Sequence, residues 1–175
     1  MKIRHFLLLV VVLISLWGTG CAPARSGMDY LESGGHGEVS GEMNGIEFSA
    51  LIEISPTGES VRVEYLSPAS LSGLTVTKKE ERYEVRLGEV CSVCDRTEIA
   101  GFLRPVTAFL PYGDAKSVQK EGENTILTFP DGGMLTLSPK GEPFAFKRED
   151  IEMRVVWWQS AKECRVQSAK LYETS

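Results

Sequence analysis

Strict alternation of apolar and polar side chains is the feature that most restricts the fold of this chain. Four stretches show it: "IEFSALIEIS" (46–55), "SVRVEYL" (60–66), "RYEVRLG" (82–88) and "IEMRVVWW" (151–158). Neighbouring side chains of an extended strand point to opposite faces, so a period of two marks a strand with one buried and one solvated face. The connections "SPTGES", "PDGG" and "SPKGEP" carry the Pro, Gly and Asp residues of tight turns. The sequence therefore predicts about eight or more antiparallel strands joined by short connections.

One segment breaks the alternation. In "DRTEIAGFLRPVTAFLP" (95–111) the apolar residues recur every three or four positions, which is the spacing of an amphipathic helix. We expect one main helix, or two short ones hinged at Pro105, because a proline inside a straight helix costs about 3 kcal/mol. A helix of this length covers only part of a sheet face. Either the sheet curls around it, or some apolar surface stays available to a ligand or partner. The fold class is thus mainly β, of the α+β type.

The N-terminal residues have the layout of a secretory signal peptide. Lys2 and Arg4 precede an apolar run at 6–13, and small residues at 18–20 lead into Cys21. The apolar core is shorter than the ~20 residues that span a bilayer. Small residues before a cysteine resemble the lipobox of bacterial lipoproteins, although the family prefers Leu at the position of Gly18. The resemblance implies a covalent diacylglycerol on Cys21 and no other cofactor; ordinary secretion with a structural Cys21 is the alternative.

These signals divide the chain into four parts. We expect a signal peptide at 1–20, a glycine-rich tether at 21–37, a β domain at 38–160 and a C-terminal tail at 161–175. Removal of the signal leaves 17 of the 19 basic residues against 24 acidic ones, a net charge of −7. An acidic domain lacks the basic surface that nucleic acid requires, so we expect no nucleic-acid partner. The acidic pair Glu149 and Asp150 falls at a turn and is expected to face water.

The order of elements resembles a known superfamily. The leading strands, the segment "VEYLSPASLSGLTVT", the mid-chain helix and the closing "GEPFAFKREDIEMRVVWW" are similar to the LolA/LolB-like lipoproteins. Within that superfamily the chain resembles small envelope lipoproteins of Gram-positive, clostridial bacteria, such as the germination lipoprotein GerS. The resemblance implies a curved sheet or half-open β-barrel with the helix on its concave face. Carriers of the superfamily hold acyl chains there, whereas the germination lipoproteins bind another envelope protein.

Three cysteines other than Cys21 are candidates for chemistry. Cys91 and Cys94 form "CSVC", with Cys164 far downstream. Because an exported protein meets an oxidising environment, a disulfide among them is the simplest interpretation. A thiol-disulfide oxidoreductase is an alternative, although the strand before "CSVC" alternates instead of being continuously apolar as in thioredoxin-like enzymes. A zinc site that adds His36 to the three cysteines is the third interpretation.

Large apolar side chains supply the candidate binding surface. Trp157 and Trp158 are consecutive in a predicted strand and must point to opposite faces, so one of them can be an exposed binding anchor. Phe102, Val106 and Phe109 belong to the predicted helix. They form either part of a filled core or the wall of a hydrophobic cavity.

Catalytic motifs are scarce in this sequence. His36 is the one histidine left after the signal is removed, and it lies in the predicted tether, which argues against Ser-His or Cys-His catalysis. We expect no enzyme and no bound metal. The expected function is that of an exported protein, lipid-anchored to the outer face of the cytoplasmic membrane or to an outer membrane. There it would be a non-enzymatic binding module for another envelope protein, or alternatively a carrier of lipid or another hydrophobic ligand.

Overall fold

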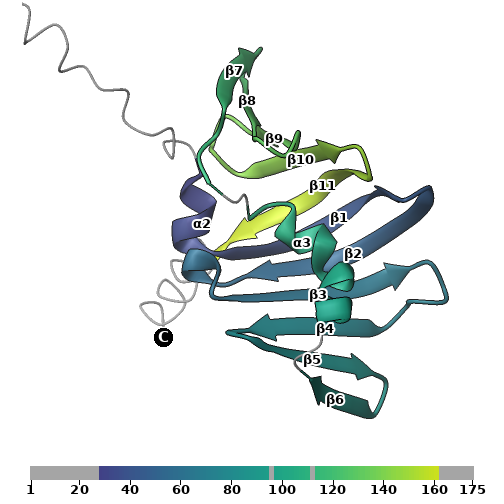
Figure 1. Cartoon of the computed structure of the whole chain (residues 1–175). Coiled ribbons are helices and arrows are strands. Elements are labelled where there is room, and N and C mark those ends of the chain that lie inside the picture. Colours follow the sequence, from purple (N-terminus) through teal and green to yellow (C-terminus); the bar gives the residue numbers. More distant parts are fainter. Residues whose placement is uncertain (1–27, 95–96, 111–112, 162–175) are drawn as a thin grey trace, which may run out of the picture.

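The described part of the chain forms one open antiparallel sheet. A computed structural model describes residues 28–94, 97–110 and 113–161, which include eleven strands in the order β6-β5-β4-β3-β2-β1-β11-β10-β9-β8-β7 (Figure 1). The strands are β1 (Gly35–Met43), β2 (Ile46–Ile54), β3 (Ser60–Ser67), β4 (Leu74–Lys79), β5 (Arg82–Leu87), β6 (Val90–Cys94), β7 (Ser117–Glu121), β8 (Asn124–Thr128), β9 (Met134–Leu137), β10 (Pro143–Arg148) and β11 (Ile151–Ser160). The helical segments are α2 (Asp29–Ser33), the 3-10 turns η1 (Pro56–Gly58) and η2 (Thr97–Leu103), and α3 (Arg104–Thr107). No helix within these ranges is both long and apolar enough to cross a membrane.

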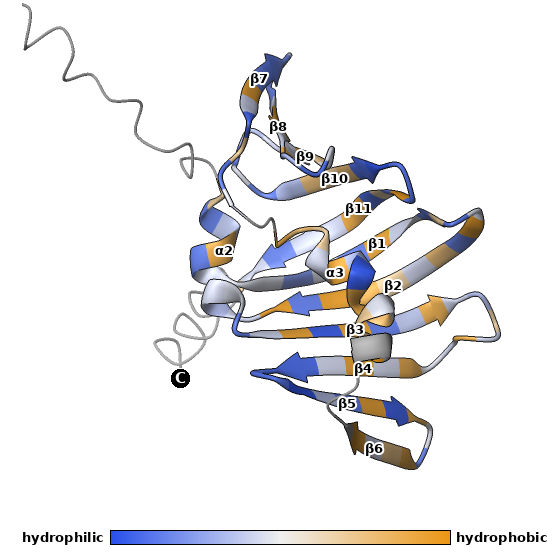
Figure 2. Cartoon of the chain, in the orientation of Figure 1, coloured by the Kyte–Doolittle hydropathy of each residue, from blue (hydrophilic) through white to orange (hydrophobic). Residues whose placement is uncertain are grey.

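The four alternating stretches are all strands, which confirms the mainly β prediction. They correspond to β2, β3, β5 and β11, and Figure 2 shows apolar and polar residues alternating along them. The edge strands β6 and β7 do not pair with each other, so the sheet is open. Its curved form fits the predicted curved sheet (Figure 1). The predicted signal peptide, Cys21 and Cys164 lie outside the described residues.

The predicted tether extends too far toward the C-terminus. Residues 29–33 form α2, and β1 begins at Gly35. Tyr30 is buried and donates a hydrogen bond from its hydroxyl to the Phe109 carbonyl, 2.6 Å away. Glycine richness here serves close packing: a Cβ on Gly37 would lie 2.4 Å from the Trp157 carbonyl oxygen and 3.0 Å from the Trp158 ring. Residues 35–37 have the composition of a flexible linker, but they are the start of the central strand β1.

The inner face of the sheet, defined here as the face that carries η2 and α3, holds the core. Val39, Ile52, Val63 and Leu135 point into it from four strands and are almost completely buried. Instead of one main helix, η2 and a four-residue α3 lie over the middle of the sheet, with Pro105 in the first turn of α3 (Figure 1). Of the two predicted alternatives, one main helix or two short ones hinged at Pro105, the structure has the second, because proline is tolerated at a helix start and not in its interior.

Polar contacts hold these short helical segments to the sheet. The hydroxyl of Tyr65 on β3 donates to the Phe102 carbonyl at 2.9 Å, and burial raises the pKa of Tyr65 to about 12. Arg104 of α3 donates to Asp150 in the β10–β11 turn. Arg148 donates to the same carboxylate from Nε at 2.8 Å and to Asp131 from Nη1 at 3.2 Å. Asp150 is therefore half-buried and doubly ion-paired, which corrects the expectation that it simply faces water.

We expect Gly37→Ala to destabilise the protein by about 1–3 kcal/mol, because the new methyl group must displace either the β11 backbone or the Trp158 ring. Urea unfolding followed by circular dichroism measures the change. Gly101→Ala is the matched control, since a Cβ at Gly101 meets nothing within 4 Å. Equal midpoints for the two variants would contradict the packing argument.

We expect Asp150→Asn to lower the free energy of unfolding by about 1 kcal/mol at neutral pH, since the ion pairs are partly exposed to solvent. The hydrogen bond from Arg148, together with the charges of both arginines, lowers the pKa of Asp150. The native pKa is therefore below the unfolded value of about 3.9. The stabilisation is complete above that value and disappears as the pH falls through the native pKa. Denaturation midpoints measured from pH 7 to pH 2 should thus converge at the acidic end; a constant gap would contradict this assignment.

Candidate functional site

The outer face of the sheet, opposite η2 and α3, presents rows of polar side chains and the exposed side chain of Trp157. On β1, His36 lies in register beside Glu53 of β2. Glu38, also on β1, lies between Trp157 of β11 and Leu51 of β2. The register shifts between Glu38 and Val39, which pair with Trp157 and Val155. This β-bulge leaves Val156 without a partner on β1, and Val156 is 57% exposed.

Trp157 is held in one orientation on this face. Its indole Nε1 donates to Glu38 Oε2 at 3.1 Å, and its ring meets the His36 ring edge to face with centroids 5.6 Å apart. The side chain nevertheless remains 42% exposed. An exposed tryptophan that is already ordered loses little conformational entropy when a partner covers it, which is a property of binding anchors.

A shallow groove lies beside Trp157. It has a volume of about 270 Å³ and includes side chains or backbone from four adjacent strands, β11, β1, β2 and β3. Its floor includes Leu51, and Arg62 and Glu64 form an ion pair at 2.8 Å along its β3 side. The lining residues are His36, Gly37, Leu51, Ile52, Glu53, Arg62, Glu64 and Trp157. Small-molecule sites usually measure about 300–1,000 Å³, so this groove fits a single protruding side chain better.

Trp158 does not share this surface. As the sequence predicts for consecutive strand residues, it lies on the opposite, inner face, where it meets Tyr30 edge to face at 6.0 Å. Its ring lies against Gly35 and Gly37, and its indole nitrogen is buried without a hydrogen-bond partner among the described residues. Only Trp157 is therefore placed to contact a partner on the outer face.

The three apolar residues of η2, α3 and the following turn have different environments. Val106 and Phe109 are completely buried, and Phe109 meets Phe146 edge to face. Phe102 is 38% exposed and contacts Tyr65. None of these three residues lines any of the four hollows described for this structure. Val106 and Phe109 act as packing residues.

The "CSVC" motif forms the last four residues of the edge strand β6. Cys91 pairs in register with Arg86, and its free, exposed thiol lies 3.6 Å from Glu84 Oε1. His36 lies four intervening strands away, which is about 24 Å at the usual strand spacing, so a zinc site joining His36 to Cys91 is wrong. Within the described ranges no group of three or more His, Cys, Asp or Glu side chains is arranged to hold a metal ion.

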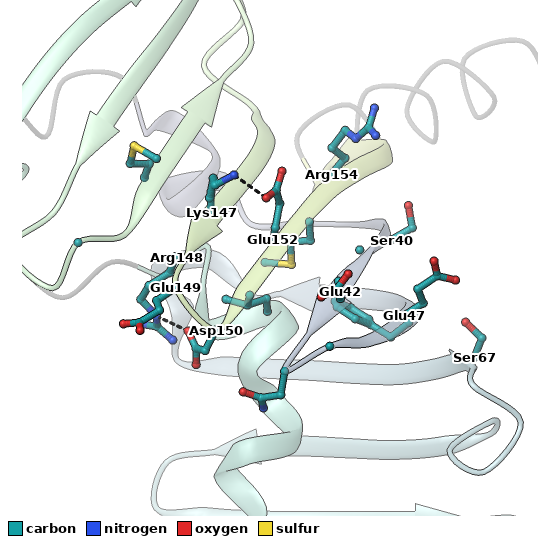
Figure 3. A pocket seen from close by; sticks show the side chains of 18 residues that line it. Ser40, Glu42, Glu47, Ser67, Lys147, Arg148, Glu149, Asp150, Glu152 and Arg154 are labelled. Atoms are coloured by element: carbon teal, nitrogen blue, oxygen red, sulfur yellow. Dashed lines mark hydrogen bonds and ion pairs between the residues drawn. The ribbon is translucent and has the colours of Figure 1, made fainter.

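A larger, charged cleft was not foreseen from the sequence. It opens between the β1–β2 and β10–β11 hairpins, has a volume of about 860 Å³, and is shown in Figure 3. The backbone N–H of Asn44 donates to the Asp150 carbonyl at 2.9 Å and joins the two hairpin tips. Glu42 lies in register between Glu152 and Glu47, so three carboxylates stand side by side on neighbouring strands. Lys147 offsets part of this repulsion through its 2.6 Å ion pair with Glu152.

This cleft presents its carboxylates to solvent. Glu42, Glu47, Glu149 and Glu152 are exposed, and no histidine or cysteine lines the cleft. Asp150, the half-buried carboxylate of the lining, is ion-paired with Arg104 and Arg148. The sequence could not reveal it, because the glutamates come from separate strands and become neighbours only through register.

Comparison with known proteins informs the fold alone. No family model matches the chain, and no curated protein matches it. A crystal structure of an uncharacterized conserved protein from Thermus thermophilus is similar with a TM-score of 0.50 and 16% identity, covering 77% of this chain and 82% of that one. A LolA superfamily protein from Nitrosomonas europaea superposes more loosely, with a TM-score of 0.37 and 11% identity over 79% of this chain and 76% of its own. The chain thus shares its fold with an uncharacterized bacterial protein, and its function must be inferred from its own residues.

Proposed function

We propose that the protein is an exported lipoprotein that acts as a non-enzymatic binding module for another protein of the cell envelope. The observation that carries this proposal is Trp157, an ordered and exposed tryptophan on a sheet face that no described helix covers. Tryptophan is among the residues most enriched at the energetic centres of protein interfaces. The bulge at Val156 adds a second exposed apolar side chain directly beside it.

The arrangement of the two sheet faces supports docking over ligand carriage. A carrier of acyl chains needs an apolar cavity, and the inner-face residues Val106 and Phe109 are used in packing. The outer face offers polar rows around one aromatic anchor, which is the composition of a protein-binding surface with a polar rim. The lipid on Cys21 would hold this face near the membrane surface, where envelope partners are concentrated.

Photocrosslinking in living cells tests the docking surface. A benzophenone amino acid at Val156, beside Trp157, should give one discrete protein adduct after irradiation, because this position lies at the edge of the proposed interface. The control position is Val118 on the edge strand β7, which is also an exposed valine. Adding Trp157→Ala to the Val156 probe should reduce the adduct at least tenfold, as expected for loss of an anchor residue.

Other adducts would contradict the proposal. Equal yields from positions 156 and 118 would show non-specific collision, and a yield unaffected by Trp157→Ala would remove the anchor. Lipid in place of protein on the probe, identified by mass spectrometry, would favour the carrier of a hydrophobic ligand. Circular dichroism of each variant shows whether the sheet is intact.

We expect Cys21→Ser to move the protein from the membrane fraction to the soluble exported fraction, because the predicted signal alone is too short to anchor it. Cell fractionation with immunoblotting measures the distribution. Cys91→Ser is the matched control, since that thiol is exposed and far from the predicted lipidation site in sequence, and it should leave the distribution unchanged. Full membrane retention of Cys21→Ser would contradict lipid anchoring.

A further inference from the structure

The groove beside Trp157 carries an excess of negative charge. Glu53 and Glu64 line it, and Glu38 adjoins it through its hydrogen bond to Trp157. Arg62 is the one lysine or arginine in the lining, and it is already paired with Glu64. Glu53 is exposed and forms no ion pair with any described residue. Arg62 lies opposite Glu53 in register but donates to Glu64, which leaves the Glu53 carboxylate for an incoming positive charge.

The orientation of Trp157 favours a cation. Its indole N–H already donates to Glu38 and is not free for a ligand. Hydrogen bonds to a ligand would therefore come from the surrounding carboxylates. What the indole still offers is its exposed ring surface. Ring faces attract ammonium and guanidinium groups, tryptophan most strongly, with about 0.5–1 kcal/mol at exposed sites.

The shape of the groove suits a long side chain. Its volume of about 270 Å³ accommodates one side chain, and Leu51 gives the floor an apolar patch. Lysine and arginine bury an aliphatic stem against such a surface while the charged end remains at a polar rim. The net charge of −7 on the chain after the predicted signal acts in the same direction, because it attracts basic partners over distances of about a Debye length.

We propose that this groove binds a lysine or arginine side chain presented by the envelope partner. The aliphatic stem of that residue lies on Leu51 and Trp157, and its charged end lies at Glu53. The inference rests on the proposed docking function and adds the chemistry of the partner: a basic segment. The occupant is a protein side chain and not a free cation, because the polar groups that line the groove are all at least partly exposed and cannot enclose an ion.

Binding of two synthetic peptides tests this inference. The probes are acetyl-Gly-Ser-Lys-Lys-Ser-Gly-amide and its twin with both lysines replaced by glutamine, titrated into detergent-solubilised full-length protein at low salt. Nuclear magnetic resonance follows the Trp157 indole N–H signal, assigned by its loss in Trp157→Phe. The lysine peptide should shift this signal in a saturable manner, and the glutamine peptide should bind at least tenfold more weakly.

Two matched variants separate the groove from general acidity. Glu53→Gln should weaken binding of the lysine peptide about three- to tenfold, whereas Glu42→Gln should change it less than twofold. Glu42 is a fair control because it is also exposed, lies on the same outer face and forms no ion pair among described residues. Trp157→Leu should weaken binding about two- to fivefold, which corresponds to the cation–π contribution.

Three results would overturn the inference: no saturable shift at millimolar lysine peptide, equal affinity for the two peptides, or equal weakening by Glu53→Gln and Glu42→Gln. The photocrosslink at Val156 distinguishes this failure from that of the docking function. If the protein adduct forms in cells and its yield is unchanged by Glu53→Gln, the docking function is supported and the proposed binding of a basic side chain is contradicted. If no Trp157-dependent adduct forms, the docking function itself is contradicted.

Discussion

The pairing of β1 with β11 is the interaction on which the rest of this structure depends. The first six strands are joined to one another in sequence, as are the last five, and only this pairing joins the two groups edge to edge. It consists of nine residue pairs that connect positions at least 108 residues apart, the separation of Met43 and Ile151. Contacts of such long range carry a large loop-closure cost and must be compensated by dense packing.

The glycines of β1 make that dense packing feasible. Gly35, Gly37 and Gly41 leave no room for a Cβ against β11; Trp158 occupies the space beside the first two, and Met153 lies against Gly41. On the same strand pair the bulge at Val156 turns Trp157 outward. Consecutive strand residues point to opposite faces in any register, so the bulge decides which of the two tryptophans packs inside and which is exposed. The candidate binding surface is a direct consequence of how the central strand pair is built.

The two faces of the sheet have different roles. On the inner face η2 and α3 are held by Tyr65 and by the ion pairs of Asp150, and their apolar side chains complete the core. The outer face is covered by none of the described helices and carries glutamates, serines and arginines around Trp157. The core thus lies on one side of the sheet, and the proposed recognition surface lies on the other. This division is the main support for the proposed binding function.

The sequence by itself determined the mainly β fold, the turn positions and the opposite orientation of Trp157 and Trp158, because alternation and turn chemistry are local properties of the chain. It misassigned residues 35–37, the start of β1, to a tether, since glycine composition is the same in a linker and in a crowded strand. Only the tertiary structure decided which tryptophan is exposed, that Glu38 and His36 hold it, and that Glu53 and Glu64 line its groove. These relations follow from strand order and register, which place residues from distant parts of the chain side by side, and no local pattern encodes them.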